Sequence, residues 1–339
     1  MRSMRFDNLD AVALDADGKL DRSKQSGMFD RLDWFRLTEK HTPKGDVTVL
    51  KAEHNDAQAW LFLAKSGYFA TLMSNWLSLG SGIVYSGDPN KPLLTDELVS
   101  ELRRSGIHHI YLEPLGVESN LVRSLRHKGW ATVRSKVNLS WRVDTRGMDF
   151  DAYWAERPSK LRNTAKRKAR KGKLTFAFLD HFDSAIWAEL ESVFAASWKP
   201  PEGTPELTRE FAQAESDAGA LRLGLAYKDG QPIAAQFWTV ENGTATIHKL
   251  AYRQDSRKLS PGTILSAEMF RRALDIEKVD MINFGYGDDS YKADWMTYHV
   301  PLYAITAYDM LHFSGLWGLT KAVMRRIASR IGLDGKDDS

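Results

Sequence analysis

The sequence of 339 residues contains no cysteine, so it has no disulfide, no cysteine metal ligand and no cysteine nucleophile. It also has no continuous apolar run of about 18 residues, which excludes an ordinary membrane-spanning helix. Acidic residues interrupt the opening stretch MRSMRFDNLDAVALDADGKLD, which is therefore unlike a secretory signal peptide. We expect a protein of the cytoplasm, where disulfides are rare.

Neither sign of charge dominates, because 47 Lys and Arg residues are balanced by 44 Asp and Glu residues, for a net charge of +3. That excess is too small to indicate nucleic-acid binding by itself. Hydrophobic residues make up 43% and charged residues 27%, which is ordinary globular composition. The length corresponds to about two domains of roughly 150 residues each.

The pattern along the chain predicts two related domains between two extensions. Residues 1–28 are polar and aperiodic and are expected to form a flexible leader. Residues 29–145 and 146–309 each give strand, strand, strand, loop, helix and strand in that order, a weak repeat that predicts a duplicated mixed α/β domain. Residues 310–339 are expected to form an amphipathic, basic tail helix.

The clearest segment runs from Ala220 to Tyr252 and predicts three strands joined by two tight turns. Asp229-Gly230 and Asn242-Gly243 separate runs rich in apolar residues, and such pairs are strong signals of two-residue hairpin turns. A loop leads from there into the amphipathic helix PGTILSAEMFRRALDIE, and the strand VDMINFGYG follows. This order predicts a helix that starts close to the end of the third strand.

Three segments of the second half carry a resemblance to a known family: the basic opening SKLRNTAKRKARKG, the helix start RKLSPGTIL and the strand end NFGYGDDSYKADW. They resemble the GNAT-type acyltransferase domain of bacterial envelope and cellulose-biosynthesis loci, whose double-domain relatives include the Fem-type aminoacyl transferases. The resemblance implies two tandem GNAT-like domains, each with a mixed, mainly antiparallel sheet flanked by helices. The first is expected to be degenerate, since its corresponding loop carries Asp88 where a phosphate would lie.

The resemblance also implies a coenzyme A site, because GNAT proteins bind the pyrophosphate at a loop of the form Arg/Gln-x-x-Gly-x-Gly/Ala. Arg257 and Gly262 match that form, whereas Ser260 stands in place of the first glycine. Unbonded N–H groups and the helix dipole favour a negative ligand at such a start. The expected acyl-CoA contacts are Arg257, Lys258, Leu259, Ser260, Gly262 and Thr263. The alternative is an ordinary Ser-Pro helix start without a ligand.

Acylation of an amine by a thioester requires a base for the attacking ammonium and a proton donor for the leaving thiolate. His248 lies in the strand before the phosphate loop, and its ordinary pKa of about 6.5 suits a base. Strand alternation predicts that Ile247 and Lys249 point to the opposite face, so only one of His248 and Lys249 is expected to face the site. The alternative is a hydrogen-bonded, half-buried histidine.

The stretch Gly287-Asp288-Asp289-Ser290-Tyr291-Lys292 follows the next strand and resembles a Gly-Asp-x-x-Tyr-Lys signature of the family. The resemblance implies that Asp288 positions or deprotonates the amine and that Tyr291 protonates the thiolate. It also implies that Lys292 contacts phosphate or an anionic substrate. Either His248 or Asp288 is therefore the expected base, and the alternative for this stretch is a polar turn with an internal Asp–Lys pair.

Two basic segments indicate partners. Eight Lys or Arg residues lie between Lys160 and Lys173, which predicts a solvated helix face or a site for anionic lipid headgroups, coenzyme phosphates or tRNA. In the tail, one helix face can gather Leu316, Leu319, Val323 and Ile327, while the cations elsewhere are Lys321, Arg325, Arg326 and Arg330. This composition suits a helix on a membrane surface or a helix packed on the protein's own core.

We therefore expect an acyl-CoA-dependent N-acyltransferase that uses no metal and acylates an amine of an envelope lipid or saccharide. A ceramide-synthase-like reaction on a long-chain amino base is included in this expectation. The location expected is the cytoplasm, with a peripheral contact to anionic membrane at the inner face of the cytoplasmic membrane if the tail binds there. Two alternatives remain: a Fem-type aminoacyl transferase that uses aminoacyl-tRNA, and a non-catalytic scaffold of an envelope-synthesis complex. Nucleic acid is expected only under the first of these.

Overall fold

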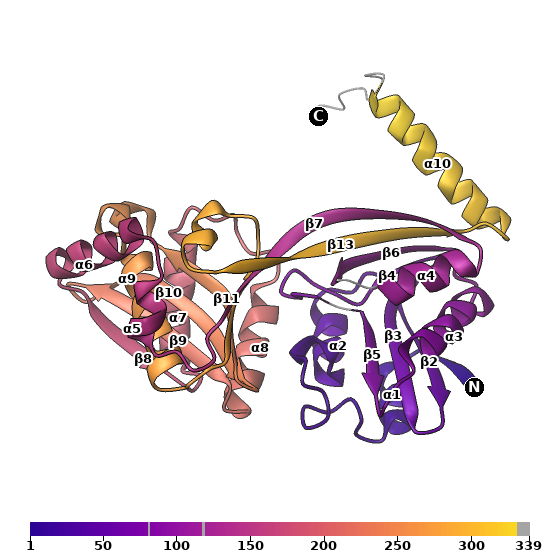
Figure 1. Ribbon diagram of the computed structural model, residues 1–339, viewed down its shortest axis with the longest axis horizontal. Helices are drawn as coiled ribbons and strands as arrows, with labels where there is room; N and C mark the ends of the chain where they lie inside the picture. Colours follow the sequence, from indigo (N-terminus) through magenta and orange to yellow (C-terminus); the bar gives the residue numbers. More distant parts are fainter. Residues whose placement is uncertain (81, 117–118, 331–339) are drawn as a thin grey trace. The chain divides into compact units, whose positions relative to one another are not determined.

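The computed structural model describes residues 1–80, 82–116 and 119–330, without the side chains of 119 and 325–330. Its internal contacts divide the chain into two units (Figure 1). The first unit contains Met1–Val137 and Pro301–Ser339, and the second contains Asn138–Val300. Two strands, β7 (Trp130–Asp144) and β13 (Tyr298–Asp309), have residues in both units.

The sheet of the first unit has the strand order β1-β2-β3-β4-β6-β13, and β5 pairs with β3. The pairs are antiparallel except β4–β6, which is parallel. Besides β13, the strands are β1 (Arg2–Phe6), β2 (Asp46–His54), β3 (Ala57–Ser66), β4 (Phe69–Leu72), β5 (Ile83–Ser86) and β6 (His109–Leu115).

The core of the first unit joins this sheet to apolar faces of α3 and α4. Leu98 and Leu102 fall one helical turn apart on α3 and are fully buried in one cluster with Ile110 of β6. The helical elements are α1 (Leu9–Ala16), η1 (Met28–Asp30), α2 (Leu32–His41), α3 (Lys91–Arg104), α4 (Ser119–His127) and α10 (Phe313–Arg330).

Residues 1–28, expected to be a flexible leader, instead form part of the first unit. β1 pairs antiparallel with β2 along its whole length. The side chain of Asn8 caps α1, and Asp15 on that helix lies 2.6 Å from the buried ammonium of Lys51. The local composition gave no sign of this order, because pairing with a distant strand produces it.

The sheet of the second unit has the strand order β7-β12-β11-β10-β9-β8. Only β11–β12 is parallel. The predicted hairpins are confirmed, since both residues of Asp229-Gly230 and of Asn242-Gly243 have the positive φ that these turns require. The further strands are β8 (Thr175–Leu179), β9 (Leu221–Lys228), β10 (Gln231–Glu241), β11 (Thr244–Tyr252) and β12 (Met281–Tyr286).

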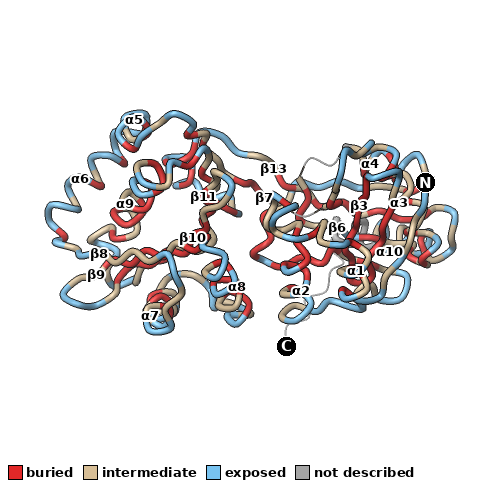
Figure 2. Tube along the Cα trace, turned by 90° about the horizontal axis from the view of Figure 1, so that it is seen from below, coloured by how far each residue is buried: buried red, intermediate tan, exposed pale blue. Residues whose placement is uncertain are grey.

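Helices cover both faces of this second sheet, with α9 on one side and α7 and α8 on the other (Figure 2). Neighbouring residues of β10 show the two faces: Phe237 packs on Trp187 of α7, and Trp238 packs on Phe270 of α9. The helical elements are α5 (Phe150–Ala155), α6 (Ser159–Gly172), α7 (Ser184–Ala195), α8 (Pro205–Asp217), η2 (Gln254–Leu259), α9 (Pro261–Asp275) and η3 (Ser290–Asp294).

The mixed α/β class with mainly antiparallel strands is confirmed, but the boundaries of the units differ from the expected ones. Residues 301–309 were assigned to the second half, whereas β13 pairs there with β6 of the first unit. Residues 138–144 were assigned to the first half, whereas this end of β7 pairs with β12. Across the described parts of the chain, no helix is both long enough and apolar enough to cross a membrane.

Candidate active site

The start of α9 offers two unbonded backbone N–H groups. Ile264 donates to the carbonyl of Ser260 at 3.2 Å, and Pro261 has no N–H. Within the described residues, no acceptor bonds the N–H of Gly262 or Thr263, and no side chain caps the helix. Unbonded amides are present both in a phosphate-binding loop and in an ordinary helix start, so the charge around these two amides bears on which of the two this is.

Ser260 has φ +54° and ψ +46°, so it already adopts the left-handed conformation that the family's first glycine allows. Its replacement of glycine therefore does not prevent the loop from turning into the helix. At the second glycine a side chain would be crowded, because a Cβ on Gly262 would lie 3.0 Å from Cδ1 of Tyr252 and the tyrosine ring would have to move. Leu259 is half-buried beside this turn.

Positive charge surrounds this helix start. Arg257 and Lys258 are exposed, and neither has a carboxylate partner among the described residues. Lys168 of α6 donates to the backbone carbonyl of Lys258, which ties the basic helix to the same loop. These cations and the helix dipole favour an anion at the amides of Gly262 and Thr263.

β11 and β12 separate beside the start of α9. They pair only from Thr244–Met281 to Thr246–Asn283, after which β11 continues to Tyr252 without a pairing on this side. β12 continues to Tyr286 and pairs with β7 on its other side. The separation leaves backbone groups of both strands without ladder partners on this side.

A β-bulge in β11 changes which residues face this region. Phe237 is opposite Lys249 and Trp238 is opposite Ile247, so His248 is the extra residue. Ile247 is buried in the cluster on the α9 side, whereas His248 and Lys249 both lie on the α7 side. The predicted alternation, with His248 and Lys249 on opposite faces, is therefore wrong, because a bulge interrupts the period of two.

His248 lies in an apolar layer. Its ring packs against Phe211 of α8 and Phe237, and its Nε2 is 2.9 Å from the hydroxyl of Thr239. Its Nδ1 is buried and has no hydrogen-bond partner in the described chain. Burial lowers the pKa of His248 to about 3, so its charged form is disfavoured at neutral pH. The geometry favours the alternative, a structural histidine, over a base.

The turn after β12 holds the other predicted residues. Lys292 is buried, and its ammonium donates to the carbonyl of Tyr286 at 2.6 Å and lies 3.6 Å from Asp289. This internal pair favours the alternative given for the stretch, a polar turn with an Asp–Lys pair, over a Lys292 that contacts phosphate or an anionic substrate. Asp288 is exposed. Burial of the Tyr291 hydroxyl, together with the negative charge of Asp289, raises the pKa of Tyr291.

The loop between α7 and α8 adds residues that the sequence gave no reason to select. Its start is fixed by the N–H of Gln254, which donates to the carbonyl of Ala196 at 3.0 Å. The ring of Trp198 then lies 4.4 Å from that of Tyr252, the residue over Gly262. This chain of contacts brings the loop to the separated strands and the start of α9.

Lys199 follows in this loop and has an unusual charge environment. Lys249 pairs with Glu202 and Lys292 with Asp289, whereas Lys199 has no carboxylate within ion-pair distance in the described structure. Burial, then the charges of Lys292 and Lys249, lower the pKa of Lys199 to about 8. The sequence signal was only a lysine before two prolines, which is typical of an ordinary loop.

Residues 156–293 match the family described as the acetyltransferase (GNAT) domain. They form a GNAT-type acyltransferase domain. The matched residues include α6, the separated strands, the start of α9 and the turn through Lys292. No curated protein matches the chain.

Solved structures extend the likeness to the whole fold. FemX has a TM-score of 0.64 at 11% identity, over 94% of this chain and 99% of that one. A C-terminal domain from Agrobacterium fabrum, named as belonging to a lysylphosphatidylglycerol synthetase, has a TM-score of 0.58 at 16% identity, over 95% and 97%. A tandem GNAT protein from the clavulanic acid biosynthesis pathway has a TM-score of 0.50 at 12% identity, over 90% and 98%. The tandem GNAT fold expected from the sequence is thereby confirmed.

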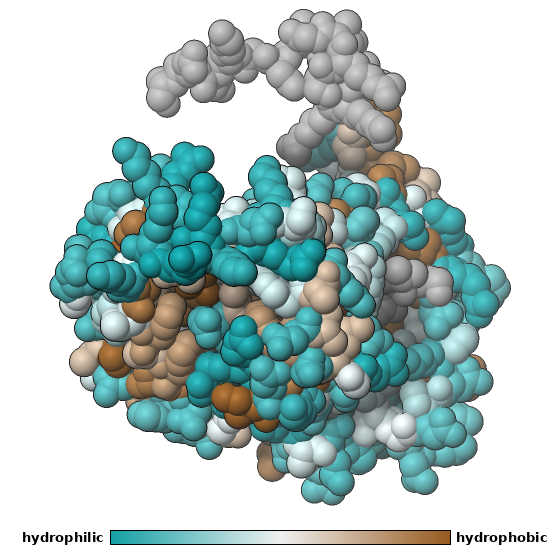
Figure 3. Space-filling view, turned by 60° about the vertical axis from the view of Figure 1, so that its left-hand side comes forward, coloured by the Kyte–Doolittle hydropathy of each residue, from teal (hydrophilic) through white to brown (hydrophobic). Residues whose placement is uncertain are grey.

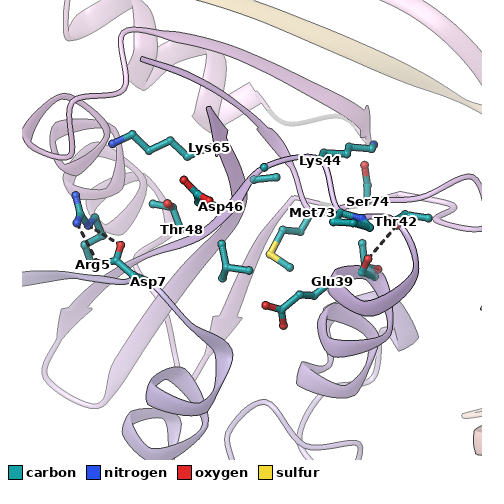
Figure 4. Close-up of a pocket in the computed structure, with 15 residues that line it drawn as sticks. Arg5, Asp7, Glu39, Thr42, Lys44, Asp46, Thr48, Lys65, Met73 and Ser74 are labelled. Atoms are coloured by element: carbon teal, nitrogen blue, oxygen red, sulfur yellow. Dashed lines mark hydrogen bonds and ion pairs between the residues drawn. The ribbon is translucent and has the colours of Figure 1, made fainter. Parts of the chain in front are cut away.

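The first unit contains a polar cavity of about 560 Å³ between the end of α2 and the sheet (Figure 4). Its charges are of both signs and partly paired, as between Arg5 and Asp7. A possible metal cluster in this unit, His108, Asp309 and His312, is engaged otherwise, because Arg103 donates to both carboxylate oxygens of Asp309 at 2.8 and 2.7 Å. Neither feature selects a ligand class.

Proposed function

We propose that the second unit transfers an acyl group from acyl-CoA to the amine of an envelope lipid or saccharide. The observation that carries this proposal is the pair of unbonded N–H groups of Gly262 and Thr263, beside exposed Arg257 and Lys258. A pyrophosphate has the charge and the acceptor oxygens that these donors match. The residues therefore fit the coenzyme, whose bound thioester supplies an activated carbonyl.

Lys199 is the residue best suited to accept the proton of the acceptor ammonium. With a pKa of about 8 it is partly neutral near pH 7, and a neutral amine is a base. The burial of His248 makes it a poor base, whereas Asp288 stays a candidate for positioning the amine. Tyr291 keeps its proton and can donate to the leaving thiolate.

Calorimetric titration with coenzyme A tests the proposal. We expect Arg257→Ala to weaken binding about tenfold or more, because a charge-assisted contact to phosphate is lost. Gly262→Val is expected to abolish binding, since a side chain there meets Tyr252 and covers the amides. Arg271→Ala is the matched control, because it removes an exposed arginine from the other end of α9. Tight binding by Gly262→Val with normal circular dichroism would contradict the proposal.

The acceptor is proposed from the chemistry of the envelope. One protein with this fold is named as a lysylphosphatidylglycerol synthetase, so a lipid-modifying enzyme can be built on it. Mass spectrometry of lipids and glycans from cells with and without the gene identifies the acceptor as the molecule that loses an amide-linked acyl chain. Cells that carry the Gly262→Val variant are the control, and they are expected to match the deletion. A complete set of amide-linked chains in the deletion would refute an envelope acceptor.

α6 supports a second candidate function, transfer of an aminoacyl group from tRNA. A surface groove of about 770 Å³ runs along α6, and none of its basic side chains pairs with a carboxylate in the described structure. The groove is lined by Lys160, Asn163, Thr164, Lys166, Arg167, Arg170 and Lys171. Binding of tRNA that is lost in Arg167→Glu/Arg170→Glu, without coenzyme binding by the wild type, supports this candidate. Binding of neither ligand supports the scaffold.

A further inference from the structure

α10 is amphipathic in the reverse of the usual sense. Gly315 is buried and Gly318, Leu319 and Ala322 are half-buried, and the two glycines lie against Asp309 and Tyr308 of the first unit. Large apolar side chains lie on the outside instead: Phe313 is 80% exposed, Leu316 40%, Trp317 45%, Val323 48% and Met324 51%. A helix that belongs only to its own domain buries the large side chains and exposes the small or polar ones.

The small residues on the inner side allow close packing, so this orientation is built in. A Cβ on Gly315 would lie 2.1 Å from the carbonyl oxygen of Asp309, and one on Gly318 would lie 3.1 Å from the ring of Tyr308. The predicted shared face of Leu316, Leu319 and Val323 fits the continuous helix α10, on which Leu319 is half-buried and the other two are exposed. The side chains of Ile327, Arg325, Arg326 and Arg330, also named in that prediction, lie outside the described residues.

The start of α10 is held to the first unit by polar contacts. His312 Nδ1 lies 2.7 Å from the Asp309 carboxylate, which also accepts from Arg103. His108 Nδ1 lies 2.6 Å from the hydroxyl of Ser314, and the rings of His108 and His312 stack at 4.0 Å. If the outer face of α10 binds a surface, these contacts would keep the first unit close to that surface.

The charge of the segment selects the kind of surface. From 310 to 333 the sequence has four cations, Lys321, Arg325, Arg326 and Arg330, and no acidic residue. Lys321 lies over the ring of Trp317 at 5.1 Å, so a cation borders the aromatic group. Figure 3 shows hydrophobic atoms gathered next to the grey C-terminal atoms. An apolar, aromatic face bordered by basic residues is the composition of a helix that lies flat on an anionic bilayer.

We propose that the outer face of α10 binds the surface of a membrane that contains anionic phospholipid, with Phe313 and Trp317 among the acyl chains and Lys321 at the headgroups. A second copy of the chain fits less well, because it would place four cations against four cations. No described helix crosses a membrane, so the association is peripheral. This inference does not rest on the acyl-transfer reaction.

Vesicle flotation of the full chain tests the proposal. We expect binding to vesicles of phosphatidylcholine with phosphatidylglycerol, and at least about tenfold weaker binding to phosphatidylcholine alone. Phe313→Ala/Trp317→Ala is expected to weaken binding to the anionic vesicles at least about tenfold, because two exposed apolar side chains are lost. Lys321→Glu is expected to weaken it mainly at low salt.

Leu14→Ala/Tyr68→Ala is the matched control, since it removes two exposed large side chains elsewhere in the first unit and is expected to bind like the wild type. Circular dichroism and coenzyme titration of each variant separate loss of the surface from loss of the fold. Equal binding by wild type and Phe313→Ala/Trp317→Ala overturns the proposal, as does no binding by the wild type. Light scattering that shows a dimer dependent on Phe313 and Trp317 also overturns it, in favour of a second copy.

Discussion

Replacing Lys199 with methionine tests whether its charged ammonium destabilises the folded protein, as expected of a group that is kept for function. In the folded protein burial and two neighbouring lysines lower its pKa from 10.5 to about 8. That change corresponds to about 3 kcal/mol, at about 1.4 kcal/mol per pKa unit. Because the side chain keeps some contact with water, we expect Lys199→Met to raise the free energy of unfolding at pH 7 by about 1–3 kcal/mol.

The pH dependence gives the sign of this effect. Between pH 8 and 10.5 the unfolded chain binds a proton at Lys199 and the folded chain does not, so the wild type gains stability as pH rises through this window. The advantage of Lys199→Met is therefore full below pH 8 and lost toward pH 10.5. Urea denaturation followed by circular dichroism from pH 7 to 10.5 measures it.

A matched lysine and an activity measurement complete this test. Lys166→Met removes an exposed lysine of α6 and is expected to leave the unfolding free energy nearly unchanged. Lys199→Met is also expected to lose acyl transfer while keeping coenzyme binding, since Lys199 is the proposed base and does not hold the pyrophosphate. A destabilised Lys199→Met, or one whose difference from the wild type is the same at pH 7 and 10, would refute the reasoning.

Three further changes follow from the structure. The pKa of His248 is lowered from 6.5 to about 3, so stability should fall as pH drops below 6.5, by about 1–2 kcal/mol at pH 5, and His248→Gln should remove that loss in urea denaturation. Arg103→Ala should destabilise the first unit by about 3–5 kcal/mol, because Asp309 is fully buried, and adding Asp309→Asn should restore part of it in thermal unfolding. Ser260→Gly should stabilise the second unit by about 1 kcal/mol, because the φ of +54° is a strained conformation for serine but not for glycine, and calorimetry should show that coenzyme binding is retained.

Local patterns in the sequence were sufficient for elements whose geometry is decided by adjacent residues. Asp-Gly and Asn-Gly pairs are favoured in two-residue turns because they tolerate the positive φ that such turns require, so the two hairpins of the second unit were predicted from Asp229-Gly230 and Asn242-Gly243. The start of α9 was also readable, because Pro261 and Gly262 fix the first turn and leave the next amides unbonded. The proposed position of the coenzyme loop rests on the second of these short segments.

Which side chains face the candidate site, and which of them can act as a base, depended on contacts between distant segments. The relative faces of His248 and Lys249 were mispredicted because a bulge between β10 and β11 breaks the alternation, and no glycine in TIHKLAY indicates it. The pKa of Lys199 is lowered first by burial and then by two lysines that β11 and the turn after β12 bring near its loop. The outward direction of Phe313 and Trp317 depends in the same way on which side of α10 packs against β6 and β13.

The sequence by itself determined where the chain turns, where helices start and which segment offers unbonded amides, because each of these depends on backbone preferences of neighbouring residues. Only the tertiary structure decided that residues 1–28 are ordered, that residues 301–309 join the first unit and which charged groups lie together. These depend on strand pairing and burial across long sequence separations, where one residue of register changes which face a side chain occupies.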